Sequence, residues 1–532
     1  MGNDVAIAEL KAENDWLKSE NEKLIDENAK LKILNDWYLE QLRLAQHRRF
    51  GASSERSIFP EQLSLFNEAE AYAQETPELE QEQVGSYSRK KRKGKREEFY
   101  SGLPTEQVVH ELPESERVCP ICGGQLHACG HEVLRREVEV IPAQVRAIEH
   151  VQTVYTCRDC EQNAEVDTLP MVKSPVPAPV IAGSGIASPS LLAFILCNKY
   201  VLALPLYRQE QELQRIGIHI SRQTMANWIV FVSLHWFVLI YNLLYGELIG
   251  NDIIHADETT VQVIHEDGRK ASQKSYMWMY CTGRSSVRQI AMFEYQPTRE
   301  GKHPAGFLAG FQGYLNVDAY AGYRGLENSA IILVECWAHV RRKFDEAVKS
   351  LKKSGQSDAV ARIGLDFCNE LFALERKFDG LDLSNEERAE RRNLESKPIA
   401  EAFFAWAESI QAQVILKTKL SVAVGYAINQ RAWLMNFLLD GRLEISNNRA
   451  ERSIRPFAIG RKNWLFSNSA KGAKASAIVY SLVETAQANG LVPFMYLTHL
   501  LQTLPNIPSD QIHECLPWSS IVQRICGIPQ SI

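Results

Sequence analysis

Two aspartates near the middle of the chain stand in or directly after apolar, strand-like segments. Asp257 lies in NDIIHADETTVQVIHED (251–267), inside or at the end of a strand predicted from Ile253 to Val263. Asp318 follows the short apolar run of GYLNVDAYAGY (313–323). Carboxylates on neighbouring buried strands repel one another and need a cation between them. Magnesium prefers carboxylate and phosphate oxygens, so the pair indicates a magnesium site.

A third carboxylate is expected from a later helix, and Glu451 is the best candidate. It lies in GRLEISNNRAERSIRPFAIGRKNWLFS, where Ser446 or Asn447 can cap a helix. We expect this helix to run to about Arg455 and Pro456 to end its straight part. With Asp257 and Asp318, Glu451 could hold two magnesium or manganese ions about 4 Å apart. The plainer alternatives are solvated loop aspartates and an ion pair between Glu451 and Arg455.

Basic residues surround the candidate carboxylates and could contact the DNA backbone. One group lies around Glu451 and comprises Arg449, Arg452, Arg455, Arg461 and Lys462. A second group follows the second aspartate along the chain and comprises His339, Arg341 and Arg342. The alternative for the second group is a solvent-facing basic helix end.

The elements that must position the carboxylates alternate between strands and helices. Further strands are predicted at 276–283 and 288–296, and 330–344 reads as a strand that runs into a helix. Three strands, a helix and then alternating strands and helices indicate an α/β ribonuclease-H-like core over 246–349 and 436–490. Glu451 follows Asp318 by 133 residues, and the Leu-, Glu-, Lys- and Arg-rich stretch between them predicts an all-helical insertion at 350–435. Residues 491–532 form a small C-terminal region.

Four cysteines in two C-x-x-C pairs predict one structural zinc ion. The pairs are Cys119–Cys122 and Cys157–Cys160, and the segment between them is rich in Val and Ile. Two such pairs joined by strands are typical of a zinc ribbon, in which four thiolates surround zinc as a tetrahedron. We place this domain at 111–170. Four unrelated thiols are the alternative.

A helix-turn-helix is predicted within 186–245, after a Pro-, Gly- and Ser-rich hinge. Pro205 can open the first helix, Gly217 ends it and Ser221 caps the second. Three polar residues of the second helix could reach base edges or phosphates, namely Arg222, Gln223 and Asn227. An ordinary helical hairpin would show the same pattern.

The N-terminal region combines a predicted coiled coil with a polar linker. Within 1–47, Leu10, Leu17, Leu24 and Leu31 repeat every seven residues, and a row of Asn follows four residues after each Leu. This heptad pattern predicts a parallel two-stranded coiled coil and therefore a homodimer, with a solvated surface helix as the alternative. Residues 48–110 are predicted to be a linker whose basic run RKKRKGKR could bind phosphate.

Composition limits the class of protein. A chain of 532 residues is too long for one core. No run of 18 apolar residues and no signal peptide is evident, so we expect no membrane segment and a cytoplasmic protein with reduced cysteines. The formal charge of −6 is a poor guide to DNA binding, because local patches set phosphate affinity.

Several long motifs together resemble one family. They are the zipper with RRFGASSERS, the cysteine pairs, HADETTVQV, VDAYAGY, CWAHVRRKF and NNRAERSIRPFAIGRKNWLF. Over nearly the whole chain, this set resembles transposases of the insertion sequence 66 family, which are of the DDE type. The resemblance implies that Asp257, Asp318 and Glu451 are the catalytic triad. Ser446 departs from the Asp that the family often has there, which concerns a cap and not the triad.

The resemblance also implies a reaction and partners. Water would attack a phosphodiester at the element end and leave a 3′ hydroxyl, which would then attack target DNA. Double-stranded DNA is therefore the expected partner, the bacterial nucleoid is the place of action, and small accessory proteins from the same element are candidate partners. Three rivals remain: a catalytically inactive DNA-binding regulator, a scaffold that assembles partners through the zipper, and a metal-dependent nuclease without strand transfer.

Overall fold

The computed structural model describes residues 145–156, 171–351 and 360–528. Residues 178–351 and 360–528 belong to one compact unit, and 145–156 and 171–177 belong to a second. The predicted coiled coil, the linker with its basic run and the four zinc-ribbon cysteines lie outside the described residues. The described part of the smaller unit holds a two-stranded antiparallel sheet of β1 (Val154–Thr156) and β2 (Met171–Lys173), with Tyr155 paired to Val172.

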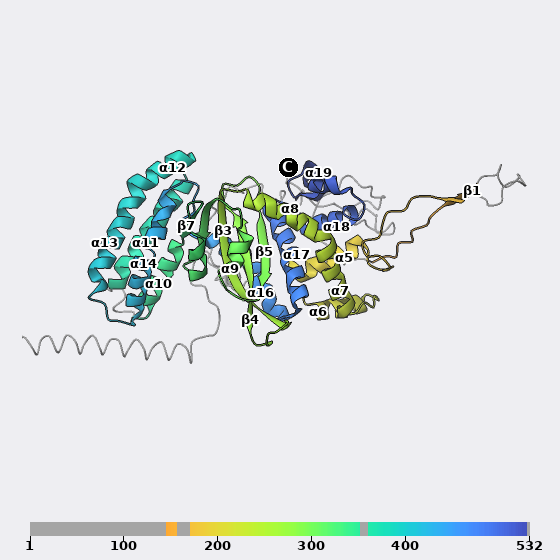
Figure 1. Ribbon diagram of the computed structural model, residues 1–532, viewed down its shortest axis with the longest axis horizontal. Coiled ribbons are helices and arrows are strands. Elements are labelled where there is room, and N and C mark those ends of the chain that lie inside the picture. The colour runs from red at the N-terminus through yellow and green to blue at the C-terminus, as the bar shows by residue number, and fades with distance from the viewer. Residues whose placement is uncertain (1–144, 157–170, 352–359, 529–532) are drawn as a thin grey trace, which may run out of the picture. The chain divides into compact units, whose positions relative to one another are not determined.

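A mixed sheet forms the centre of the larger unit (Figure 1). Its strands run in the spatial order β5–β4–β3–β6–β7. The first three pair antiparallel, whereas β6 pairs parallel with both β3 and β7. In chain order the strands are β3 (Ile253–His265), β4 (Lys274–Thr282), β5 (Ala291–Gln296), β6 (Gly313–Val317) and β7 (Ile331–Glu335). They lie where the apolar segments predict strands, which confirms an α/β core.

Helices surround this sheet in two groups, each with its own hydrophobic core. The first group contacts the side of β3, β4 and β5 and comprises α5 (Pro189–Tyr200), α6 (Leu206–Arg215), α7 (Arg222–Val232), η2 (Ser233–Phe237), α8 (Val238–Ile249), α16 (Asn448–Trp464), α17 (Ala470–Ala488), α18 (Pro493–Thr503), η7 (Ser509–Cys515) and α19 (Ser520–Cys526). Two short helices connect the strands: α9 (Lys302–Phe307) and η3 (Ala321–Leu326). The short strand β8 (Ser467–Ser469) follows α16. It is a third partner of β3 and pairs parallel with the C-terminal end of that strand.

The second group lies beyond β7 and contains the helices between β7 and α16 (Figure 1). It comprises α10 (Trp337–Lys349), α11 (Val360–Asp379), α12 (Asn385–Arg391), η5 (Arg392–Ser396), α13 (Lys397–Gln411), α14 (Lys419–Asn429), α15 (Arg431–Leu434) and η6 (Met435–Leu438). Trp337, Phe344 and Phe403 are fully buried where these helices meet. The part of the chain that the structure describes between 360 and 435 is therefore helical, as the composition predicts.

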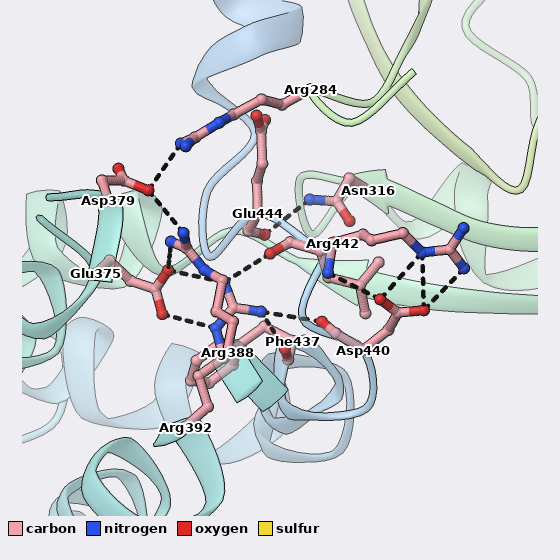
Figure 2. Close-up of polar contacts among 11 residues, drawn as sticks. Arg284, Asn316, Glu375, Asp379, Arg388, Arg392, Phe437, Asp440, Arg442 and Glu444 are labelled. Carbon is pink, nitrogen blue, oxygen red and sulfur yellow. Dashed lines mark hydrogen bonds and ion pairs between the residues drawn. The ribbon is translucent and has the colours of Figure 1, made fainter. Parts of the chain in front are cut away.

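A buried arginine fixes the end of this helical group (Figure 2). The side chain of Arg392 is 1% exposed and donates to both carboxylate oxygens of Glu375 at 2.7 Å. Its remaining donors bind the backbone carbonyls of Phe437, Asp440 and Leu443 at 2.7–3.0 Å. A guanidinium with all its hydrogens bound is stable in the interior. Arg392 therefore anchors the segment that leads back to the sheet.

The helix that carries Glu451 is longer than the sequence predicts. α16 continues through Pro456 to Trp464, whereas we expected its straight part to end at Pro456. Asn447 occupies the N-cap position, but its side chain makes no capping hydrogen bond. Buried Ile454 and Phe457 hold the second half of α16 in the core, which outweighs the backbone hydrogen bond that proline lacks. The prediction for the helix end was therefore wrong.

One helical stretch is apolar enough to cross a membrane by length and composition alone, although the sequence analysis expects none. It runs from Arg222 to Ile249 and comprises α7, η2 and α8. Phe237, Ile240 and Leu244 of this stretch are fully buried, and Tyr241 donates a hydrogen bond to the carbonyl of Phe293 in β5. Part of the apolar character of this stretch is therefore explained by side chains that pack in the protein core.

The Arg392 anchor predicts a large loss of stability on substitution. Arg392→Met leaves the three carbonyls without their buried donor and Glu375 with Arg388 alone, which should lower the free energy of unfolding by about 3–5 kcal/mol. The control Arg362→Met breaks only the exposed pair with Asp366 on α11 and should cost less than about 1 kcal/mol. Urea denaturation of both variants measures this difference, and equal losses would contradict the anchor.

Glu484 predicts a pH-dependent stability. It lies on α17 beside Tyr480, and burial raises its pKa to about 7. Because the unfolded side chain titrates near 4.3, the folded state loses stability as pH rises from there to about 7. At pH 8, Glu484→Gln should be more stable than the wild type by about 1–3 kcal/mol, and this gain should shrink toward pH 5. Denaturation at both pH values tests it, with exposed Glu401→Gln as the charge control; a gain that does not change with pH would refute it.

Candidate active site

The sheet register brings the two aspartates level with each other. On the parallel strands β3 and β6, Ile253 pairs with Tyr314 and His255 pairs with Asn316. Continued by two residues, this register sets Asp257 beside Asp318. Neighbouring strands lie about 4.8 Å apart, so two carboxylates at this position repel each other unless a cation separates them.

Helix α16 places Glu451 against the same strand. The side-chain amide of Asn447 donates to the carbonyl of Ala256 at 2.8 Å, directly before Asp257. In the last turn of α16, the guanidinium of Arg461 donates to the carbonyl of Thr260. The helix therefore lies along β3, and Glu451 is in its first turn.

Burial and the nearby negative charges change the pKa of Asp257. The side chain is partly buried, and its Oδ1 accepts the backbone N–H of Glu258 at 2.9 Å. Burial is the largest cause of a pKa that lies well above the usual aspartate range, and the charges of Glu258, Asp318 and Glu451 raise it further. The three predicted carboxylates therefore lie close enough to act on one another.

A fourth carboxylate at this site, Glu258, was missed by the sequence analysis. Its side chain is 2% exposed, accepts the Tyr323 hydroxyl at 2.7 Å and pairs with the guanidinium of Arg299. Arg299 also lies over the ring of Tyr320, 3.8 Å from its centroid. The only local signal was the acidic pair at 257–258, because Arg299 and Tyr323 come from segments more than 40 residues away.

Glu451 pairs with helix α10 and not with Arg455. Its carboxylate lies 3.4 Å from Arg342 and 3.6 Å from the Nε2 of His339. Burial lowers the pKa of His339 despite the opposing charge of Glu451, so the ring is neutral at pH 7. Two buried atoms at this contact have no hydrogen-bond partner among the described residues: Glu451 Oε1 and His339 Nδ1.

The donor set fits a hard divalent cation, although the side chains do not yet enclose one. No group of three His, Cys, Asp or Glu side chains within the described ranges is arranged to hold a metal ion. Asp318 Oδ1 accepts the backbone N–H of Tyr320 at 3.0 Å, and Glu451 is turned to Arg342. Carboxylate oxygens and one unpartnered buried Oε1 are the ligands that magnesium and manganese prefer. Oε1 could reach a cation while Oε2 faces Arg342, and ligation by both oxygens would require Glu451 to exchange Arg342 for the cation.

The basic residues predicted to bind DNA differ in their surroundings. Arg341 donates to Asn369 at 2.7 Å, Arg449 pairs with Glu444 at 3.2 Å, and Arg461 contacts Thr260. Each of these three side chains therefore binds another group of the protein in this structure. The side chain of Arg342 is 38% exposed beside Glu451, Arg455 is partly buried, and Arg452 and Lys462 are exposed on α16.

The segment predicted to be a helix-turn-helix forms the helices α6 and α7. Gly217 adopts a φ of 85° in the turn, a conformation that favours glycine, and the Ser221 hydroxyl caps α7 by accepting the N–H of Thr224. Arg222, Gln223 and Asn227 are exposed, and Gln223 donates to Asn227 at 3.0 Å. These three residues are on α7, whereas the carboxylates are on β3, α16 and the end of β6. Pro205 is the N-cap of α6 and not its first residue.

Four family models match segments of the chain. A model described as Transposase IS66 family matches residues 184–475, more than half of the chain. The IS66 C-terminal element matches 481–518, and the zinc-finger binding domain of transposase IS66 matches 116–161. A model described as Transposase C of IS166 homeodomain matches 37–108.

Similar curated proteins come from Sinorhizobium fredii. The uncharacterized protein y4qI is 32% identical over 534 residues, which covers 96% of this chain and 92% of that protein. The uncharacterized protein y4hP is 30% identical over 453 residues, covering 82% and 78% respectively. The similarity therefore extends over almost the entire length of the chain.

The negative charges around Asp257 predict that its carboxylate destabilises the metal-free protein but is needed for cation binding. In metal-free buffer at pH 8, Asp257→Asn should raise the free energy of unfolding by on the order of 1 kcal/mol, because it removes a repelled charge. A hundredfold excess of Mg²⁺ over its Kd should stabilise the wild type by about 2.7 kcal/mol and the variant much less. Thermal unfolding with and without Mg²⁺ measures both effects. The exposed residue Asp366 on α11 provides the control Asp366→Asn, and equal Mg²⁺ stabilisation of both variants would contradict the site.

Proposed function

The chain belongs to the IS66 transposase family, and we propose that it is a DDE transposase that cleaves DNA at the ends of its element and joins them to target DNA. Asp257, Asp318 and Glu451 are the proposed catalytic residues. The observation that carries this proposal is the convergence of three carboxylates from β3, the end of β6 and α16, two of which, Asp318 and Glu451, raise the pKa of Asp257.

The proposed reaction is phosphoryl transfer on DNA. Asp257, Asp318 and Glu451 would hold two magnesium or manganese ions, which supply activation of the attacking oxygen and stabilisation of the leaving oxygen. Because Arg342 already neutralises Glu451, it can move to a DNA phosphate when Glu451 turns to the aspartates. Neutral His339, beside Glu451, can accept a proton or a hydrogen bond from an incoming water.

The proposed DNA contacts come from several elements. Arg222, Gln223 and Asn227 are exposed on α7, which is suited to groove contacts by a helix-turn-helix. Arg452, Arg455 and Lys462 on α16 are candidates for backbone contacts near the carboxylates. Arg341, Arg449 and Arg461 are proposed to support this surface indirectly, since each binds a protein group.

The architecture supports a ribonuclease-H-like core over 246–349 and 436–490, interrupted by the helical insertion 350–435. Support comes from a sheet with three antiparallel strands followed by two parallel ones, with Asp257 on its central strand β3 and Asp318 directly after β6. We keep as proposals a zinc-ribbon domain at 111–170 with Cys119, Cys122, Cys157 and Cys160 as ligands, a homodimer through 1–47, and action on DNA in the bacterial cytoplasm. The zinc-finger match supports zinc itself.

A nicking assay on DNA that carries the element's inverted repeats tests the proposal. Full-length wild type should nick the repeat end only with Mg²⁺ or Mn²⁺, and strand transfer should follow when a target duplex is added. Asp257→Asn, Asp318→Asn and Glu451→Gln should each lose about 10³-fold in rate, because several kcal/mol of charge stabilisation disappear.

Three outcomes distinguish the alternatives. Asp366→Asn, on the exposed face of α11, is the matched carboxylate control and should nick as the wild type does. Nicking that survives all three triad variants would refute the proposal. Nicking without any strand transfer from pre-nicked ends would leave a metal-dependent nuclease.

A further inference from the structure

Asn447 connects the strand of Asp257 directly to Glu451. Its side-chain Nδ2 donates to the carbonyl of Ala256 at 2.8 Å, one residue before Asp257. Its own backbone carbonyl accepts the N–H of Glu451 at 3.1 Å, which is the first hydrogen bond of α16. One residue therefore spans the gap between two of the proposed catalytic carboxylates.

The surroundings of Asn447 leave it little freedom. The residue is 1% exposed, and its Oδ1 lies 3.0 Å from Nδ1 of the fully buried His255. Because Nδ2 already donates to Ala256, Oδ1 must accept, and Nδ1 of His255 carries the proton. The backbone N–H of Asn447 donates to Cys336 Sγ at 3.1 Å, at the start of α10.

The neighbouring residue Asn316 links the strand of Asp318 to the same segment. Asn316 is buried on β6, and its amide donates to the carbonyl of Glu444 at 2.9 Å. The loop 444–447 is thus tied to β3, β6 and the start of α10 at once. These are the elements that carry Asp257, Asp318 and the pair His339 and Arg342.

Asn447 holds the N-cap position of α16 but does not cap it. An Asn in this position commonly uses its side chain to accept an N–H of the first helical turn. Here that side chain is directed to β3 instead, so the capping bond is given up for a contact with the strand. A cap would be needed only for the helix, whereas this contact fixes the helix relative to Asp257.

We infer that Asn447 is a positioning residue that sets Glu451 against Asp257 and thereby determines the affinity of the carboxylate site for its divalent cation. This inference rests on the proposed function, because it requires Asp257 and Glu451 to share a cation. It concerns this chain's own residues and predicts a change in metal affinity that does not depend on DNA.

The test measures Mn²⁺ binding to the full-length, zinc-loaded protein by the EPR signal of free Mn²⁺. Asn447→Leu keeps the branched shape of the side chain and removes both side-chain hydrogen bonds, so Mn²⁺ should bind about 10- to 100-fold more weakly. The matched control is Asn436→Leu, because Asn436 donates in the same way to the carbonyl of Leu333 on β7, which carries no triad residue. It should lose thermal stability without a change in Mn²⁺ affinity.

A double-mutant cycle separates positioning from general damage. In the Glu451→Gln background, Asn447→Leu should cause little further weakening of Mn²⁺ binding, because the ligand that it positions is already gone. A purely structural role would weaken Mn²⁺ binding equally in both backgrounds and would overturn the inference.

A second variant covers the case in which Asn447→Leu does not fold. His255→Leu removes the donor to Asn447 Oδ1, together with the 3.4 Å contact of its Nε2 with Glu444, and should weaken Mn²⁺ binding by a smaller factor. Folded Asn447→Leu or His255→Leu protein with wild-type Mn²⁺ affinity overturns the inference while the triad variants still lose nicking. Wild-type Mn²⁺ affinity and nicking in Asp257→Asn and Glu451→Gln would instead refute the proposed function itself.

Discussion

Repulsion between like charges is the constraint around which the site is built. The register of β3 and β6 sets Asp257 beside Asp318, and Glu258 and Glu451 add two more carboxylates. Such a group is unstable without positive charge nearby. Arg299 and Arg342 supply that charge at the two edges of the site. A divalent cation would relieve the same repulsion at its centre and release Arg342 for another partner.

The second constraint is distance along the chain. The helices between β7 and α16 must return Glu451 to the sheet, and they do so through buried polar contacts. Arg392 binds the carbonyls of 437, 440 and 443, Asn316 binds that of Glu444, and Asn447 binds that of Ala256 (Figure 2 shows the first two). Because each contact satisfies a buried group with a fixed geometry, the position of Glu451 follows from the fold of the helices between β7 and α16.

The sequence predicted what depends on local pattern. Apolar, strand-like runs located β3 to β7 but not the short sixth strand β8, and Ser221 capped α7 as expected. It did not predict α16 beyond Pro456, because packing of Ile454 and Phe457 against the sheet decides that helix's length. Ser446 or Asn447 was predicted to cap this helix, but the side chain of Asn447 binds β3, which is distant in sequence. Glu258 was missed for the same reason: its partners Arg299 and Tyr323 are brought in only by the fold.

The central claim is that three carboxylates, brought together by the fold, form one site for divalent cations. The most direct measurement is the anomalous diffraction of Mn²⁺ in crystals of the full-length protein. The account predicts a Mn²⁺ peak ligated by Asp257, Asp318 and Glu451, with Glu451 turned away from Arg342. A peak at another place, or Glu451 still paired with Arg342 while Mn²⁺ occupies the aspartates, would contradict it.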